Sequence, residues 1–156
     1  MVEEPRFIAT PGLLRRAYNA LSARLFTGVV VAGFEDLRPA HGNVLEHLSE
    51  RPPEALRLVD LAARAGMTPQ SMGELVDDLE ARGYVERRPD PADRRAKRVH
   101  LTDKGLACAR AAERSMREVE RQLVAALGDA EYRRLRAALE QVLDARPAPD
   151  RAPNGQ

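Results

Sequence analysis

A glycine turn between two short, apolar-periodic segments limits the fold of this 156-residue chain more than any other feature of its sequence. Apolar residues recur at helical spacing on both sides of the turn, at Leu58, Leu61, Ala62 and Ala65 before it and at Met72, Leu75, Val76 and Leu79 after it. Gly66 suits the left-handed position after a helix, while Thr68 and Pro69 supply an N-cap and a first-turn proline. The pattern predicts a helix-turn-helix over about 57–82.

Directly after this motif the apolar period changes from helical to alternating. Tyr84–Arg88 and Lys97–Leu101 alternate as strands do, and the proline-rich segment Pro89–Asp93 separates them. We therefore expect a two-stranded hairpin, called the wing below, beside the helix-turn-helix.

Further helices are predicted on both sides of this lobe. Residues 11–32 keep a helical apolar spacing, Pro39 can open a short helix, and Gly128-Asp129 separates a long helix that follows Thr102 from a last one. The composition agrees, because 44% apolar residues with no tryptophan and few other aromatics are typical of a mainly α protein.

The predicted elements divide the chain into five parts. These are a flexible leader (1–10), an N-terminal dimerisation helix with its connection (11–38), a winged helix-turn-helix lobe (39–101), C-terminal dimerisation helices (102–144) and a disordered tail (145–156). The first helix and the two last ones carry apolar seams longer than one subunit can fully bury, which favours a homodimer. The alternative is that these seams fold back within one chain.

Basic residues gather on the predicted wing, although the whole chain carries a net charge of only +1. Residues 82–98 contain seven basic and three acidic residues, so this segment carries +4 and the remainder −3. A charge run alone is more often a solvated loop. Beside a helix-turn-helix, however, an arginine-rich arm suits the phosphate backbone of double-stranded DNA.

Taken together, the order, spacing and motifs of residues 11–143 resemble the MarR (multiple antibiotic resistance regulator) family of winged-helix transcription factors. Asp93-Arg94-Arg95-Ala96-Lys97 matches the family's D-x-R-x-K wing pattern, and Leu101-Thr102-Asp103-Lys104-Gly105 matches its L-T-x-x-G. The resemblance implies a homodimeric repressor on a pseudo-palindromic operator. It also implies relief by a small aromatic or phenolic effector, bound where the dimerisation helices meet the winged-helix lobe.

The second helix of the helix-turn-helix is the expected recognition helix. Its apolar stripe faces inward, so the polar residues of its first turns point toward base edges, and the candidates there are Thr68, Gln70, Ser71 and Glu74. Gln70 suits adenine and Glu74 the amino group of cytosine, while Thr68 or Ser71 can bond a phosphate. The helix is acidic where the family is often basic, so the wing should supply most of the phosphate attraction.

In the wing, the resemblance assigns Arg95 to the minor groove, with Asp93 orienting its guanidinium. Arg94 at the tip and Arg87, Arg88 and Lys97 on the strands are phosphate candidates. The alternative for each of these residues is an ordinary surface charge.

Other signals are weaker. His41, on the apolar stripe of the second helix, is a candidate effector contact or else a hydrogen-bonded core histidine. The single cysteine, Cys108, excludes an intramolecular disulfide and reads as a small buried hydrophobe. Three dispersed histidines argue against a metal site, and no nucleophile, phosphate-loop or zinc-protease motif occurs, so we expect neither an enzyme nor a cofactor.

The chain has neither a signal-peptide pattern nor an apolar run of membrane-spanning length, which predicts a cytoplasmic protein without a membrane partner. The competing functional hypothesis is a winged-helix interaction module whose acidic recognition face docks a basic protein instead of DNA.

Overall fold

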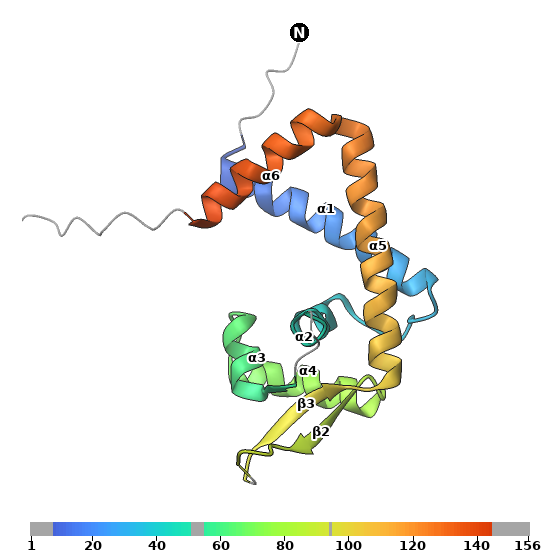
Figure 1. Cartoon of the computed structure of the whole chain (residues 1–156), viewed down its shortest axis with the longest axis vertical. Helices are drawn as coiled ribbons and strands as arrows, with labels where there is room; N and C mark the ends of the chain where they lie inside the picture. Colours follow the sequence, from blue (N-terminus) through green and yellow to red (C-terminus); the bar gives the residue numbers. More distant parts are fainter. Residues whose placement is uncertain (1–7, 51–54, 94, 145–156) are drawn as a thin grey trace, which may run out of the picture. The chain divides into compact units, whose positions relative to one another are not determined.

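The computed structural model describes residues 8–50, 55–93 and 95–144. The chain divides into two compact units, Met1–Arg117 and Glu118–Gln156. The predicted leader up to residue 7, the predicted tail and Arg94 lie outside the described residues. The elements, most of which are labelled in Figure 1, are α1 (Thr10–Val31), η1 (Pro39–His41), α2 (Gly42–Leu48), β1 (Leu56–Arg57), α3 (Leu58–Arg64), α4 (Pro69–Ala81), β2 (Val85–Pro89), β3 (Lys97–Leu101), α5 (Asp103–Leu127) and α6 (Asp129–Asp144).

The predicted mainly helical, winged helix-turn-helix fold is confirmed. Gly66 ends α3 with a φ of +61°, a conformation that favours glycine because it has no Cβ. The next N–H, of Met67, donates to the Ala62 carbonyl at 2.8 Å, and Thr68 then caps α4. The turn therefore forms for the reasons that its sequence suggests.

The wing sheet has three strands, not the expected two. All pairs are antiparallel and the order is β1-β3-β2, with Leu56 opposite Val99 and Arg57 opposite Arg98. The hairpin itself keeps the predicted strands, with Val85 opposite Leu101. The β1 strand contains only two residues and runs directly into α3, so it is too short to show an alternating pattern.

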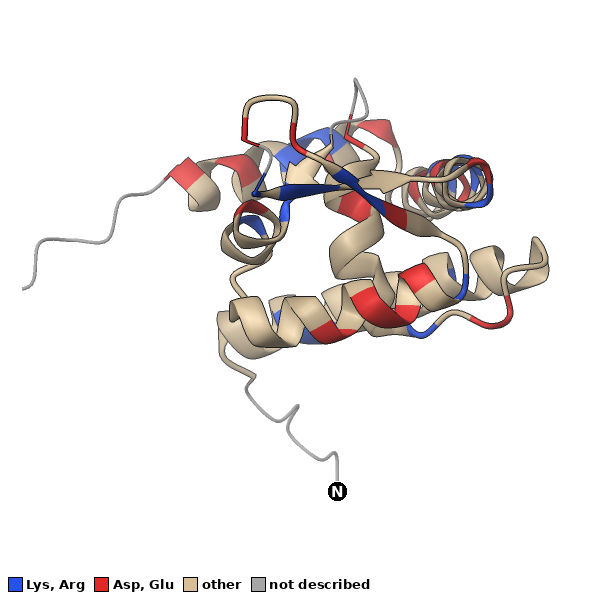
Figure 2. Cartoon of the chain, turned by 90° about the horizontal axis from the view of Figure 1, so that it is seen from below, with Lys and Arg blue, Asp and Glu red and all other residues tan. Residues whose placement is uncertain are grey.

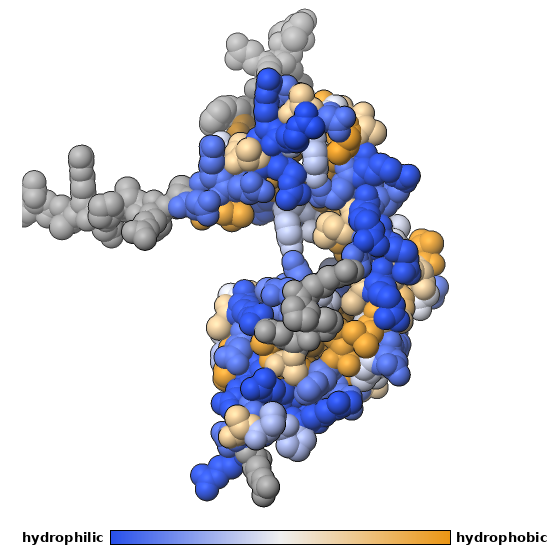
Figure 3. Space-filling view, viewed as in Figure 1, coloured by the Kyte–Doolittle hydropathy of each residue, from blue (hydrophilic) through white to orange (hydrophobic). Residues whose placement is uncertain are grey.

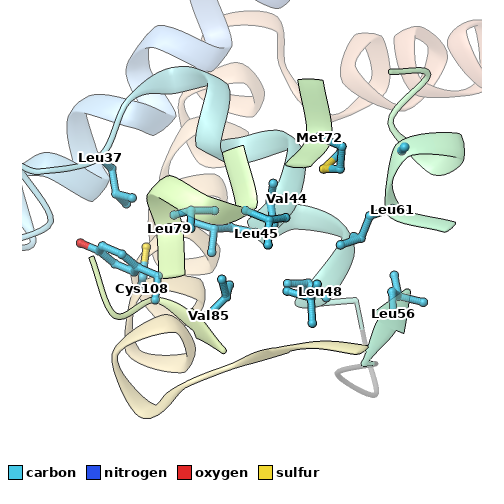
Figure 4. Close-up of a cluster of buried hydrophobic side chains, with 14 of the residues drawn as sticks. Leu37, Val44, Leu45, Leu48, Leu56, Leu61, Met72, Leu79, Val85 and Cys108 are labelled. Atoms are coloured by element: carbon cyan, nitrogen blue, oxygen red, sulfur yellow. The ribbon is translucent and has the colours of Figure 1, made fainter. Parts of the chain in front are cut away.

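One apolar core joins the helix-turn-helix to the sheet and to the start of α5. Figure 4 shows side chains from α2, α3, α4 and the strands meeting there. Fully buried members include Leu48, Leu61, Met72, Leu79 and Val99. Because each large apolar side chain removed from water contributes about 1.5–3 kcal/mol, this core fixes how α4 is presented.

The L-T-x-x-G motif shapes the junction between the wing and α5. The Thr102 hydroxyl donates to the Gly83 carbonyl at 2.6 Å and accepts the Gly105 N–H at 3.1 Å. A Cβ at Gly105 would lie 2.1 Å from the Tyr84 carbonyl oxygen, which is closer than any side chain allows. The glycine therefore lets the first turn of α5 lie directly on the chain entering β2.

Several helices keep exposed apolar residues. On α1, Leu13 and Tyr18 have 57% and 67% of their surface exposed. In the second unit, α6 buries none of its residues, and Leu135, Leu139 and Val142 form an exposed stripe at helical spacing. By contrast, hydrophilic residues cover the face of α5 visible in Figure 3.

Candidate nucleic-acid interface

The predicted contact residues of α4 lie together on its exposed side. Gln70, Ser71 and Glu74 are exposed, while Met72 and Val76 of the opposite side are buried. Side chains at the N-terminal end of this helix are therefore free to reach a partner.

Thr68 belongs to the same exposed face but also has a structural task. Its hydroxyl oxygen accepts the Ser71 N–H at 3.2 Å and donates to the Ser71 hydroxyl at 3.0 Å. Since the Thr68 proton is used in this way, the Ser71 hydroxyl is the better placed of the two to donate to an incoming phosphate.

Within the protein, an arginine of the wing balances the acidic residues on the middle of α4. Arg87 on β2 lies 2.6 Å from Asp77 through Nη2, pairs with Glu80 through Nη1, and donates its backbone N–H to Glu80 at 2.9 Å. This three-point contact joins α4 to the wing and reduces the acidic field expected from the sequence.

Asp78, the third acidic residue of α4, is also compensated. Arg82 Nε lies 2.8 Å from its carboxylate, Arg38 pairs with it, and His41 Nε2 lies 2.9 Å away. These cationic and N–H partners, Arg82 above all, lower the pKa of Asp78 to about 2.

His41 is completely buried, as the core interpretation expects. Its Nδ1 accepts the Arg38 backbone N–H at 3.0 Å, so a neutral ring carries its proton on Nε2 and donates it to Asp78. Burial lowers the pKa of His41, and the hydrogen bond to Asp78 opposes this effect without reversing it.

Residues of α1, η1, α2 and α5 surround a pocket of about 1080 Å³ inside the first unit. Its lining includes aromatic and sulfur-containing side chains as well as Arg38 and His41, and the chief members are Tyr18, Phe26, Cys108 and Met116. Cys108 is buried, which raises the pKa of its thiol to about 11. His41 also lines the pocket, and both of its ring nitrogens are already hydrogen-bonded, Nδ1 to the Arg38 N–H and Nε2 to Asp78.

On the hairpin, few of the predicted phosphate candidates are free. Arg87 is paired as above, and Arg88 lies 2.5 Å from Glu86. Within the described part of the hairpin, Arg95 and Lys97 are exposed cations without an ion pair. Figure 2 shows that basic and acidic residues alternate closely in this region.

Asp93 contacts Arg95 differently from the expectation. Its Oδ1 accepts the Arg95 backbone N–H at 3.0 Å, rather than holding the guanidinium. The contact shapes the turn, and the long Arg95 side chain extends from it.

Sequence reasoning missed Asp90, which is buried although it sits in the wing turn. Arg57 Nε donates to its Oδ2 at 2.7 Å, Arg98 Nε lies 3.0 Å from the same oxygen, and Oδ1 accepts the Ala92 N–H at 2.9 Å. The sequence Asp-Pro-Ala carried a signal for the last contact, because an aspartate often bonds the N–H two residues on. No local sequence pattern identifies Arg57 as a partner of Asp90, because the strand that contains Arg57 was not predicted.

Comparison with known sequences shows what this arrangement is similar to. Residues 35–96, which include the helix-turn-helix and most of the wing, match the sequence profile of the MarR family. A segment of 90 residues is 32% identical to YkoM of Bacillus subtilis (strain 168), an uncharacterized HTH-type transcriptional regulator. The match covers 58% of this chain and only 55% of that relative, so it spans about half the length of the curated protein.

Solved structures extend the similarity over most of the chain. The transcriptional repressor CouR, bound to a 23-mer DNA duplex, superposes with a TM-score of 0.71 at 26% identity, covering 86% of this chain and 92% of CouR. The PcaV transcriptional regulator from Streptomyces coelicolor, in complex with its natural ligand, gives 0.67 at 25% identity and covers 93% and 99% of the two chains.

Across residues 8–50, 55–93 and 95–144, none of the helices has the length and apolar character needed to cross a membrane.

Proposed function

We propose that the chain is a transcriptional regulator of the MarR family, a sequence-specific DNA-binding repressor that acts as a homodimer in the cytoplasm. Regulators of this family bind DNA and catalyse no reaction, so the chain is not an enzyme. The observation that carries the proposal is the exposed polar face of α4 beside a wing whose Arg95 and Lys97 are unpaired among the described residues.

In the proposed complex, the N-terminal turns of α4 enter the major groove. Gln70 pairs with adenine through its amide, Glu74 accepts from cytosine, and Thr68 and Ser71 approach the phosphates at the positive end of the helix. Because the core holds the buried side of α4, these side chains enter the groove without rearrangement of the helix.

The wing supplies the second set of contacts. Arg95 enters the minor groove from a turn shaped by Asp93, and Arg94, Arg88 and Lys97 lie along the phosphates. Arg87 is also proposed to contact the edge of the phosphate backbone, although its guanidinium already pairs with Asp77 and Glu80.

Dimerisation would cover the apolar residues that α1 and α6 expose. Two recognition helices related by a two-fold axis then read half-sites about one helical turn apart, which is why a pseudo-palindromic operator is expected.

The pocket is the proposed effector site. Its aromatic lining suits a small aromatic or phenolic compound, and Arg38 and His41 link it to Asp78 on α4. A ligand that disturbs these two side chains would favour a state with a different position of α4, and thereby release DNA.

The direct test is fluorescence anisotropy with two labelled duplexes, one from the promoter of the chain's own gene and one of scrambled sequence with the same composition. We expect tighter binding to the promoter duplex. Equal affinity for both duplexes would contradict sequence-specific regulation. If neither duplex binds even at low salt, the interaction-module hypothesis is favoured. That hypothesis needs an acidic face on α4, and the arginines that pair with Asp77, Asp78 and Glu80 reduce the negative charge of this face.

A further inference from the structure

One buried carboxylate organises the turn of the wing. The Asp90 side chain has no exposed surface, whereas Pro91, Ala92 and Asp93 next to it are exposed. An ionised carboxylate is costly to bury unless cations and hydrogen bonds replace its water. A charge buried in a surface turn therefore indicates that the turn itself has to be held in one shape.

The partners of Asp90 come from different strands. Arg57 of β1 and Arg98 of β3 face each other in the sheet, and the Nε of each lies within 3.0 Å of Asp90 Oδ2. We call these three residues the wing clasp. The Ala92 N–H, followed by the two arginines, holds the pKa of Asp90 far below its usual range, so the carboxylate stays ionised at neutral pH.

Backbone bonds extend the clasp to both sides of the turn. The Asp90 N–H donates to the Ala96 carbonyl at 2.9 Å, and the Asp90 carbonyl accepts the Asp93 N–H at 3.2 Å. Asp93 in turn accepts the Arg95 N–H at 3.0 Å. Two consecutive hydrogen bonds thus connect Asp90 to the backbone of the proposed minor-groove arginine.

We propose that Asp90 is a positioning residue for DNA binding, because the wing clasp fixes the turn that carries Arg95. The inference rests on the proposed function of the wing and adds a residue that touches no DNA itself. Preorganisation is the physical reason, since an arginine on a fixed turn loses less conformational entropy when it enters a groove.

The positioning role and simple electrostatics predict opposite effects on DNA affinity when Asp90 is neutralised. Removing a negative charge from a DNA-facing hairpin strengthens attraction to phosphates if charge alone decides. If Asp90 positions Arg95, its neutralisation weakens specific binding despite the added positive charge. The sign of the effect therefore separates the two explanations.

The experiment compares Asp90→Asn with the matched control Glu86→Gln. Both substitutions remove one negative charge from the hairpin, but Glu86 has 41% of its side chain exposed, pairs only with Arg88 among the described residues, and lies outside the clasp. Affinities are measured by anisotropy on the promoter duplex and on the scrambled duplex, over a salt series.

We expect Asp90→Asn to lose about tenfold in affinity for the promoter duplex while its affinity for the scrambled duplex stays equal or rises. Glu86→Gln should keep or increase its affinity for both duplexes. Promoter binding by Asp90→Asn as tight as that of Glu86→Gln would overturn the proposal.

Folding is controlled by circular dichroism and by a second variant. Arg57→Lys keeps the charge but loses the Nε donor, so it should also weaken promoter binding selectively, and it decides the question if Asp90→Asn does not fold. Unchanged promoter binding by a folded Arg57→Lys then counts against the clasp.

Amide hydrogen exchange separates failure of the clasp from failure of the proposed function. If the wild type does not distinguish the two duplexes, the proposed function is wrong, and exchange still tests the turn. Faster exchange of the Ala92, Arg95 and Ala96 amides in Asp90→Asn, but not in Glu86→Gln, would support ordering of the turn by Asp90. Unchanged exchange rates would refute it.

Discussion

Arg95 is an exposed cation of the hairpin, and most of the arginines around it are paired. Most arginines near it are held by carboxylates of the same chain, as Arg98 is by Asp90 and Arg87 by Asp77. A paired guanidinium offers less to a phosphate, because a new contact has to compete with the existing one. The effective DNA-facing charge of the described hairpin is therefore smaller than its composition indicates.

Arg95→Ala is accordingly expected to cost about 1–3 kcal/mol of binding free energy and to lower the salt slope by about one. The measurement is an anisotropy titration of the promoter duplex at several salt concentrations. Arg134→Ala on α6, which removes the same charge far along the chain from the hairpin, is the control and should leave both values unchanged. An unaltered affinity and slope for Arg95→Ala would remove the wing from the interface.

Gln70 should act on sequence preference instead of on overall attraction. Gln70→Ala removes the amide that we propose pairs with adenine, so it should relax the preference at one position of each half-site. Affinities for single-base variants of the promoter duplex check this expectation. Equal losses on promoter and scrambled duplexes would instead identify Gln70 as a backbone contact.

His41 and Asp78 make stability depend on pH. The pKa of each is lowered by folding, so the unfolded chain binds protons more readily. Each group contributes fully to the free energy of unfolding above its ordinary pKa in the unfolded chain, which is about 6.5 for His41 and about 4 for Asp78. The His41 part is lost first as the pH falls, and the Asp78 part is lost as the pH approaches 2.

We therefore expect the free energy of unfolding to fall between pH 7 and 5, and this fall to be smaller in His41→Gln. Urea denaturation at several pH values measures both slopes, independently of any change in absolute stability. Equal slopes in the two proteins would show that His41 does not titrate differently on folding.

At the scale of elements, the junction between the wing and α5 has almost no spare volume at Gly105. Gly105→Ala would push a methyl group against the Tyr84 carbonyl, and overpacking of this kind costs about 1–3 kcal/mol. Gly42→Ala is the matched control, because the added Cβ meets nothing within 4 Å in a helical position. Thermal melts should show a clear loss for the first and none for the second, and equal melts would contradict the close contact.

Helices and strands could be predicted from the sequence where the spacing of apolar residues or a helix-capping residue marks them. The turn at Gly66 and Thr68 and the long α5 are local features, and the structure confirms them. The β1 strand is too short to have a period. The ion pairs of Arg57 and Arg87 join elements whose pairing is set only by the tertiary fold, so the sequence alone could not reveal the clasp or the link between α4 and the wing.

At the scale of the whole molecule, the exposed apolar stripe of α6 is the surface that the proposed homodimer would cover. We expect the wild type to sediment with twice its mass of 17.3 kDa. Leu139→Glu should shift it toward monomer, whereas Gln141→Glu, with the same change in charge on the same helix, should not. A monomeric wild type at micromolar concentration, or equal behaviour of the two variants, would contradict the dimer.

The contact of Arg87 with Asp77 and Glu80 has a consequence for evolution of the binding site. Since it ties α4, the proposed base-reading helix, to the hairpin proposed to enter the minor groove, we expect that the two cannot adjust independently to an operator. Insertion of one base pair within a half-site would misalign one of them with its groove. Related operators should thus differ more freely in the separation of their half-sites than in the width of each half.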